Sequence, residues 1–390
     1  MPCALCSSND QELLWELPQL PITECYGSYD PEFEAYDQAL MLCGQCGHVQ
    51  LANQLPVDKL YTKNEYAYRT GQAVGTPKRV KSFVEFCYRS INADDISVVD
   101  IGGNDQSLLD AFEQNVAYKA LVDPIRKDQD GESIDNIDIF GRFIEEMDLA
   151  SDLSVPPNVV VCTHTLEHVA NPQTFIEQLF KQCGPDTLYF FEVPCVESMV
   201  RECRFDAVFH QHIHYFSLAS FARLINEAGG VLIDHAYNEQ ATLGGALMVA
   251  FRLASIEEGA NKKLVDLDIQ GFRELFKDNK QKFIAKMAAI NELVSSTDKP
   301  LYGFGASLML PSLLYHLDVA PTRFTAILDD DEQKQGWQYK NLNLSITSPK
   351  HIDVPANAEF MVTSVENTQP ILKRLEDFSP ASVLVPLVGS

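Results

Sequence analysis

Short runs of β-branched and aromatic residues alternate with amphipathic segments through the middle of the chain. The runs predict strands at 97–101, 119–123, 158–162, 187–193, 231–236 and 246–251. Helices are predicted near 78–91 and then at 106–114, 172–182 and 217–228. Strands that alternate with helices at this spacing form parallel β-α-β units, and the last two strands are free to form a hairpin.

A second α/β pattern follows a charged segment at 256–297, which itself predicts one or two helices. Its strands are predicted at 300–306, 324–330, 359–365 and 382–387, with a helix at 306–317 after a glycine turn. The first 75 residues carry paired cysteines and an aromatic connector instead. We therefore predict an α/β protein with a small N-terminal module and connector at 1–75, a Rossmann-like domain at 76–253 and a second Rossmann-like domain at 254–390.

The composition narrows the range of partners and locations. The chain of 390 residues has 55 acidic and 30 basic residues, and its formal charge of −25 would repel a polyanion such as nucleic acid. Hydrophobic residues make up 46% and charged residues 22%, as in folded globular proteins. No export signal opens the sequence, and no apolar stretch approaches the roughly 18 residues of a membrane span. We expect a soluble cytoplasmic protein, monomeric or weakly dimeric, that binds neither nucleic-acid polymers nor membranes.

Four of the ten cysteines form two C-x-x-C pairs, Cys3 with Cys6 and Cys43 with Cys46. In a long chain without an export signal, reduced thiols are expected, and two such pairs can close a tetrahedral site of four sulfurs. The sequence therefore predicts structural zinc, with Cys25 or His48 as possible substitute ligands. Buried thiols or a redox pair are the alternatives.

The first strand of the central domain runs into a glycine turn, Asp100-Ile-Gly102-Gly103-Asn104, and Asp123 stands at the end of the next strand. Glycines let the backbone approach a ligand at the sheet edge, and a carboxylate on the second strand suits ribose hydroxyls. The dinucleotide fingerprint fails, because its later glycine positions hold Asn104 and Ser107. The form is instead typical of class I S-adenosylmethionine methyltransferases, with a purely structural turn or another nucleotide as alternatives.

The sequence His164-Thr165-Leu-Glu-His168 follows the strand at 158–162 and matches the H-x-x-E-H signature of inverted zinc proteases. That signature needs a helix that presents both histidines on one face. Here the motif follows directly on a strand, and Asn171-Pro172 soon interrupts it. We expect a loop that borders the cofactor, with His164 and Thr165 in contact with it. A protease site and plain packing are the alternatives.

Three alternate histidines, His210, His212 and His214, stand near the end of the domain. In an extended segment they would lie on one side. Neutral imidazole is well matched to proton abstraction near pH 7, so the segment indicates a general base. A three-histidine metal site or buried structural histidines would give the same pattern.

The C-terminal domain opens with a second glycine turn, Gly303-Phe-Gly305-Ala306. Such a turn before a helix can bind phosphate through its amides, although a single G-x-G is a weak signal. It motivates a second hypothesis, a nicotinamide-dependent oxidoreductase. A third hypothesis is a zinc scaffold that has kept the fold without activity.

The order of these motifs resembles the zinc-containing sugar C-methyltransferases, which act on nucleotide-linked keto-deoxysugars. The resemblance covers nearly the whole chain. Its motifs are the C-G-Q-C-G-H-V-Q segment at 43–50, the Y-A-Y-R-T connector at 66–70, the D-I-G-G-N-D turn at 100–105, the histidine segment at 210–217, the L-G-G-A turn at 243–246 and G-F-G-A at 303–306 with D-D-x-x-K-Q-G at 330–336.

The resemblance implies S-adenosylmethionine and structural zinc as cofactors and a nucleotide-linked sugar as substrate, held with help from the C-terminal domain. A base removes the proton beside the 4-keto group, and the enolate carbon then takes the methyl group. The resemblance makes His212 the base, with His210 beside it, and places Tyr215 and Tyr66 or Tyr68 around the sugar.

One departure from the family pattern concerns the base. Where the family has Tyr-His-Glu-His, this chain has Phe209-His210-Gln211-His212. The missing glutamate removes a carboxylate that could orient the histidine or raise its basicity. The departure leaves open another small-molecule substrate or another methylated atom.

Overall fold

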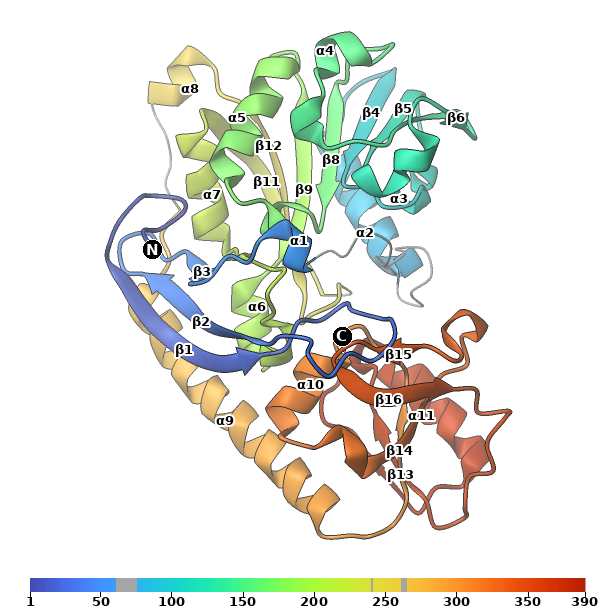
Figure 1. The fold of residues 1–390 in the computed structure, drawn as a ribbon. Coiled ribbons are helices and arrows are strands. Elements are labelled where there is room, and N and C mark those ends of the chain that lie inside the picture. Colours follow the sequence, from blue (N-terminus) through green and yellow to red (C-terminus); the bar gives the residue numbers. More distant parts are fainter. Residues whose placement is uncertain (61–75, 240, 261–264, 390) are drawn as a thin grey trace.

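The computed structural model describes residues 1–60, 76–239, 241–260 and 265–389 (Figure 1). These residues form three sheets of four, eight and six strands, and one strand of the four-stranded sheet comes from the central part of the chain. The α/β fold class therefore agrees with the sequence patterns.

The central sheet has the strand order β11-β12-β9-β8-β4-β5-β7-β6. Neighbours from β9 to β7 are parallel, while the β11–β12 hairpin and the short β6 run antiparallel at the two edges. The expected hairpin of the last two strands is thus confirmed. The strands are β4 (Ile96–Ile101), β5 (Val116–Val122), β6 (Ser133–Ile134), β7 (Ile137–Phe140), β8 (Val159–Thr163), β9 (Leu188–Pro194), β11 (Gly230–Asn238) and β12 (Ala246–Leu253).

Helices pack around this sheet, and the amphipathic segment near 78–91 is a helix as expected. The helices are α2 (Thr76–Tyr88), α3 (Ser107–Ala111), α4 (Leu149–Asp152), α5 (Pro172–Gln182), α6 (Val196–Arg201) and α7 (Leu218–Glu227). Strand β4 has β5 on one side and β8 on the other, so the chain changes direction across the sheet at β4. Ligands of open α/β sheets bind beyond the carboxyl ends of the strands at such a switch point.

The N-terminal sheet is completed by a strand from the central part of the chain. Its strands are β1 (Gln11–Leu20), β2 (Tyr36–Cys43), β3 (Val49–Leu51) and β10 (His214–Tyr215), and helix α1 (Val57–Leu60) follows β3. Strand β10 pairs antiparallel with β3, His214 opposite Gln50 and Tyr215 opposite Val49. The cysteine-containing module is therefore joined by backbone hydrogen bonds to the histidine segment.

The C-terminal sheet has the order β15-β16-β14-β13-β17-β18 and is parallel except for β15. The elements are α8 (Ile256–Ala260), α9 (Ile269–Ser295), β13 (Leu301–Phe304), α10 (Leu310–Leu317), β14 (Phe324–Leu328), β15 (Gln338–Tyr339), β16 (Leu342–Thr347), β17 (Glu359–Val362), α11 (Thr368–Leu375) and β18 (Ser382–Leu384). The helix expected at 306–317 begins only at Leu310, because residues 305–307 form the glycine turn and Pro311 occupies the first helical turn.

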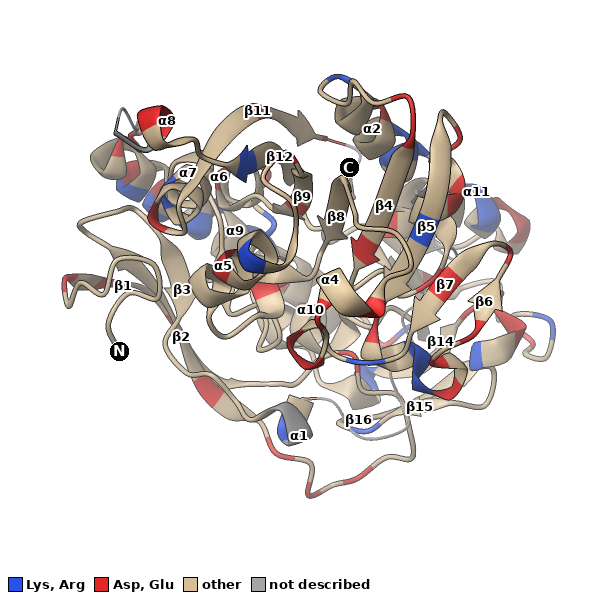
Figure 2. Cartoon of the chain, turned by 90° about the horizontal axis from the view of Figure 1, so that it is seen from above, with Lys and Arg blue, Asp and Glu red and all other residues tan. Residues whose placement is uncertain are grey.

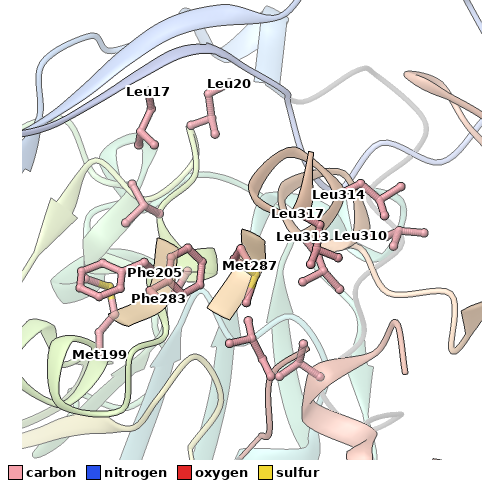
Figure 3. Close-up of a cluster of buried hydrophobic side chains, with 14 of the residues drawn as sticks. Leu17, Leu20, Met199, Phe205, Phe283, Met287, Leu310, Leu313, Leu314 and Leu317 are labelled. Atoms are coloured by element: carbon pink, nitrogen blue, oxygen red, sulfur yellow. The ribbon is translucent and has the colours of Figure 1, made fainter. Parts of the chain in front are cut away.

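One hydrophobic cluster joins all three parts of the chain (Figure 3). It contains Leu17 and Leu20 of β1, Met199 of α6, Phe283 and Met287 of α9, and leucines of α10. The 27-residue helix α9 runs from the central to the C-terminal part, beside the β1–β2 hairpin (Figure 1). The parts are therefore packed around shared apolar surface, which drives their association.

Charge is distributed over the molecule. In the view of Figure 2, acidic and basic residues are interspersed along helices and loops of the described chain. None of the helices in the described ranges has both the length and the apolar character that a bilayer crossing requires.

A buried ion-pair network connects the central and C-terminal parts. Arg204 forms hydrogen bonds with both carboxylate oxygens of Asp206, each 2.9 Å long, and with Glu366 at 2.7 Å. Glu366 also accepts from the Leu243 amide at 3.0 Å. Removal of the guanidinium would leave the buried Asp206 and the partly exposed Glu366 without their counter-charge.

We predict that Arg204→Met lowers the free energy of unfolding by about 3–5 kcal/mol, because the buried carboxylate of Asp206 loses its partner. Arg142→Met removes a half-exposed pair with Asp130 and is expected to cost less than about 1 kcal/mol. Urea denaturation of both variants measures the difference. Equal losses would show that the Arg204 network does not stabilise the fold.

Candidate active site

The four predicted zinc ligands lie together in the N-terminal module. The sulfur of Cys3 is 3.6 Å from that of Cys46, the sulfur of Cys6 is 3.5 Å from that of Cys43, and all four lie within 4.8 Å of one another. Tetrahedral zinc with Zn–S bonds of about 2.3 Å separates its sulfurs by about 3.8 Å, so the cluster fits this ion.

Neither of the two substitute ligands lies in the cluster. The thiol of Cys25 donates hydrogen bonds to the Ile22 carbonyl and to the side chain of Asn341, and it is not part of the cysteine cluster. The imidazole of His48 is 3.1 Å from that of His214. The four cysteines of the two C-x-x-C pairs therefore form the whole donor set in this group of described residues.

The first glycine turn is held tightly at the carboxyl end of β4. Gly102 has φ +73°, and its amide donates to the Val122 carbonyl at 2.8 Å. A Cβ at Gly102 would lie 2.1 Å from Oγ1 of Thr165, and a Cβ at Gly103 would lie 2.6 Å from a carboxylate oxygen of Asp100. Both positions therefore require glycine, and the loop after β8 packs directly on the turn.

The carboxylates around this turn fit a ligand that carries hydrogen-bond donors. Asp100 is fully buried, and neither of its carboxylate oxygens has a hydrogen-bond partner among the described residues. Burial, with Asp123 and Asp105 nearby, raises the pKa of Asp100 well above its ordinary range. Asp123 accepts from the Asn104 amide at 2.8 Å and the Ile125 amide at 2.9 Å, and so fixes the turn relative to the second strand. These residues could hold S-adenosylmethionine by its amino and ribose hydroxyl donors.

The H-x-x-E-H sequence is a loop and a short 3-10 helix, η4 (Leu166–His168), rather than the helix of a zinc protease. His164 has φ +51°, and its ring lies between two buried carboxylates: Nε2 is 3.1 Å from Glu192, and Nδ1 is 3.5 Å from Glu167. Burial alone would lower the pKa of His164, but the carboxylates of Glu167 and Glu192 beside its ring raise it to about 9. His164 is therefore a cation at neutral pH.

His212 lies on the other side of Glu167. Its Nε2 is 3.8 Å from Oε1 of Glu167, and its ring packs against Phe209 and His168 with centroids 4.1 and 4.8 Å away. Burial, with His168 and His164 nearby, lowers the pKa of His212 well below its ordinary value. The imidazole is therefore neutral near pH 7, as a general base requires.

The expectation that the three alternate histidines lie on one side is wrong. The segment contains the 3-10 helix η5 (Phe205–Ala207) and a turn at 210–211, and only His214 lies in a strand. His210 is bonded to the Leu20 carbonyl at 3.0 Å and to Gln38 at 3.2 Å, in the N-terminal module. Because the three rings diverge, they form no shared metal site.

A different trio, Glu167, His168 and His212, brings three donor atoms within 4.8 Å. Nδ1 of His168 donates to the Gln211 carbonyl at 2.9 Å. A dication at this cluster would stand beside the cationic His164, which disfavours it electrostatically. The arrangement is better suited to acid–base chemistry.

The remaining predicted catalytic residues divide into two groups. Tyr215 is buried; its hydroxyl accepts from the Phe209 amide at 3.2 Å and donates to the Ala207 carbonyl at 3.4 Å. It therefore supports the loop that carries His212. Tyr66 and Tyr68 lie outside the described residues.

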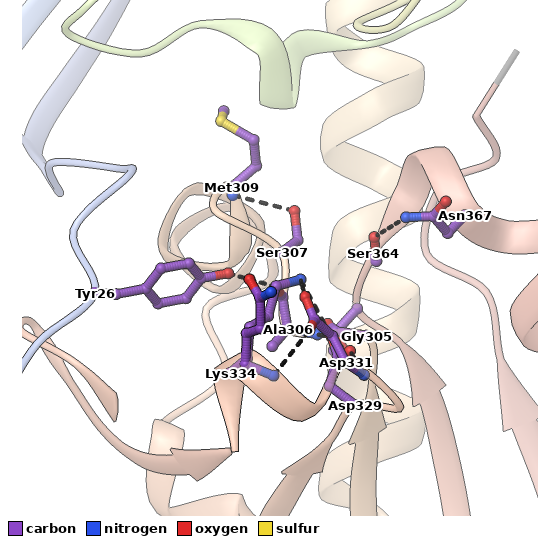
Figure 4. Close-up of polar contacts among 12 residues, drawn as sticks. Tyr26, Gly305, Ala306, Ser307, Met309, Asp329, Asp331, Lys334, Ser364 and Asn367 are labelled. Carbon is purple, nitrogen blue, oxygen red and sulfur yellow. Dashed lines mark hydrogen bonds and ion pairs between the residues drawn. The ribbon is translucent and has the colours of Figure 1, made fainter. Parts of the chain in front are cut away.

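The second glycine turn is filled by contacts within the protein (Figure 4). The Ala306 amide donates to Asp329 at 2.6 Å, and Thr363 donates to the Gly305 carbonyl at 2.7 Å. A Cβ at Gly305 would lie 2.5 Å from that of Ser364. The Ala306 amide, which could otherwise bind a phosphate, is thus already bonded to the Asp329 carboxylate. The glycine turn therefore no longer supports the hypothesis of a nicotinamide-dependent oxidoreductase.

Sequence reasoning missed the two carboxylates that surround His164. In the sequence, Glu167 stands out only as the glutamate of the H-x-x-E-H signature. Glu192 is a single charged residue within the predicted strand 187–193, and a charge inside an otherwise apolar strand was the available signal. Asn238 of β11 donates to Glu192 at 2.7 Å and completes the network.

We predict that Gly102→Ala abolishes S-adenosylmethionine binding, measured by titration calorimetry, because the new methyl group collides with Thr165. Gly131→Ala is the matched control, since Gly131 has a similar φ of +82° and its Cβ would meet no atom within 4 Å. Affinity that falls equally in both variants would attribute the effect to backbone strain alone.

We predict that Cys43→Ser reduces bound zinc, measured by elemental mass spectrometry, from about one ion per chain to a small fraction of that. It should also lower the melting temperature, because metal binding contributes directly to folding. Cys203→Ser is the control, since Cys203 lies outside the cluster. Unchanged zinc in Cys43→Ser would contradict the assignment.

Residues 75–235 match the family model "Methyltransferase domain", and residues 3–61 match "Putative zinc binding domain". The C-methyltransferase NovU of Streptomyces niveus is 23% identical over 328 residues, which cover 80% of this chain and 76% of NovU. Solved structures that align with part of this chain include N-methyltransferase NodS of Bradyrhizobium japonicum in complex with S-adenosyl-L-homocysteine, at 12% identity and TM-score 0.36, covering 48% of this chain and 92% of NodS. Magnesium protoporphyrin IX methyltransferase of Synechocystis with bound S-adenosylmethionine has 14% identity and TM-score 0.34, covering 46% of this chain and 81% of its own.

The two family matches follow one another along the chain and coincide with the cysteine cluster and with the glycine turn. The alignment with the sequence relative covers 80% of this chain, a larger share than either family match. The protein is therefore an S-adenosylmethionine-dependent methyltransferase with an N-terminal zinc module, and it fits the family of zinc-containing sugar C-methyltransferases that its motifs resemble.

Proposed function

We propose that the protein transfers a methyl group to a carbon atom beside the keto group of a nucleotide-linked sugar, with His212 as the general base. The observation that carries the proposal is that a neutral, buried histidine is joined through the loop 164–168 to the glycine turn. The relative NovU, a C-methyltransferase by name, supports carbon as the methylated atom.

The loop 164–168 connects the glycine turn with His212. Thr165 packs on Gly102 of the cofactor turn, and two residues later Glu167 faces the His212 ring. A base that serves carbon methylation has to stand near the methyl donor, because the carbanion must be made where it can be used. The loop 164–168 meets this requirement with five residues.

The chemistry assigned to His212 is the removal of one proton. The C–H bond beside the keto group breaks, the proton passes to the imidazole, and the electron pair moves onto the keto oxygen to give an enolate. Bound S-adenosylmethionine would supply an electrophilic methyl group for the enolate carbon. The packing of Phe209 and His168 against the imidazole fixes its orientation and excludes water from its faces.

We predict that His212→Ala lowers both methylation and solvent-deuterium exchange at the substrate carbon by about 100-fold to 10,000-fold, the usual contribution of a general base. The probes are nucleoside diphosphate-linked 4-keto-deoxysugars, and exchange is followed by mass spectrometry with the demethylated cofactor product present. His235→Ala, at an exposed histidine of β11, should retain wild-type rates. Full exchange in His212→Ala would rule out this base, and methylation of oxygen or nitrogen would rule out the carbon assignment.

A further inference from the structure

The chain lacks a glutamate at position 211, and the structure shows what Gln211 does instead. Its side-chain amide donates to the Thr23 carbonyl at 2.9 Å, and its oxygen accepts from the Thr23 hydroxyl at 3.2 Å. Gln211 is therefore committed to the N-terminal module. The carboxylate that faces His212 comes from another element of the fold.

That carboxylate is Glu167, the middle residue of η4. It is fully buried, and neither oxygen has a hydrogen-bond partner among the described residues. The nearest basic atoms are Nδ1 of His164 at 3.5 Å and Nε2 of His212 at 3.8 Å. A buried carboxylate costs several kcal/mol in lost hydration, so its position beside two imidazoles calls for an explanation beyond packing.

One backbone and one side-chain hydrogen bond fix the register between Glu167 and His212. The Ile213 amide donates to the Glu167 carbonyl at 2.9 Å, and the His168 ring donates to the Gln211 carbonyl at 2.9 Å. The residues on both sides of His212 are thus bonded to Glu167 and its neighbour. These bonds hold the segment of Glu167 against the segment of His212.

The titratable groups around the His212 ring come from three elements. Glu167 and His168 lie on η4, His164 lies on the loop after β8, and Tyr215 lies on β10. Of these, Glu167 is the acidic side chain. His164 is held by Glu192 on its far side, so it balances the charge of Glu167 without taking the place of His212.

We propose that Glu167 is the positioning carboxylate of His212: it faces Nε2, holds the imidazole with the proton on that atom, and leaves the lone pair of Nδ1 for the substrate proton. After proton transfer the imidazolium gains the carboxylate as its counter-ion. The inference rests on the proposed function and deepens it. The logic is that of a buried carboxylate behind a catalytic histidine in a hydrolase triad.

The test compares Glu167→Gln, which keeps the shape and removes the charge, with Glu167→Asp and with Glu145→Gln at an exposed glutamate. At pH 7 we expect Glu167→Gln to slow deuterium exchange about 10-fold to 100-fold with KM within about 2-fold of the wild type. Glu167→Asp should recover part of the rate, and Glu145→Gln should match the wild type. A rate within about 2-fold of the wild type in Glu167→Gln would overturn the proposal.

A second measurement does not depend on turnover. The ¹⁵N shifts of the His212 ring should show the Nε2–H form in the wild type and in Glu167→Asp, and a mixture with the Nδ1–H form in Glu167→Gln. An unchanged ring in Glu167→Gln overturns the role of Glu167 even if the rate falls. If the wild type exchanges no probe while the ring responds as expected, the proposed function fails and the positioning contact stands.

Discussion

The site depends on one close approach, that of Gly102 to Thr165. Strands β4 and β8 are neighbours at the switch point of the central sheet, and the turns that follow them compete for the same space. Thr165 fills the volume that a Cβ at residue 102 would need, since that Cβ would lie 2.1 Å from Oγ1 of Thr165. Only a glycine lets the cofactor turn and the histidine loop share this edge. The placement of Glu167 and His212 follows from that contact.

The zinc module acts on the site through the backbone. Strand β3 follows the second cysteine pair directly and pairs with β10, two residues beyond His212. The ring of His48, two residues after Cys46, is hydrogen-bonded to the ring of His214. A zinc ion would hold the ends of a loop of about forty residues together, which removes much chain entropy from the unfolded state. The module therefore stabilises the segment that carries the proposed base.

Most of the parallel strands could be predicted because buried strands are continuous apolar runs, as in β4 and β8. The β1–β2 hairpin could not, since one face of it is exposed and its polar positions break the run. The two-residue strand β10 exists only through its pairing with β3, which no local pattern announces. The candidate site was predicted in the same uneven way. Glycine turns are visible in sequence, whereas the contact of Glu167 with His212 joins residues 45 positions apart.

Glutamine replaces the family's glutamate at position 211, and the residues around His212 show what this replacement means. A carboxylate that orients a base has to meet two requirements. It must be shielded from water, so that its interaction with the imidazole is strong, and a nearby positive charge must offset the cost of burying its negative charge. Glu167 meets the first by full burial and the second through His164, which Glu192 keeps protonated. A glutamate at 211 would add a second anion at a position that now holds a neutral contact to Thr23. If Glu167 has the proposed positioning role, glutamine at 211 keeps the local charge balanced and is compatible with base chemistry at His212.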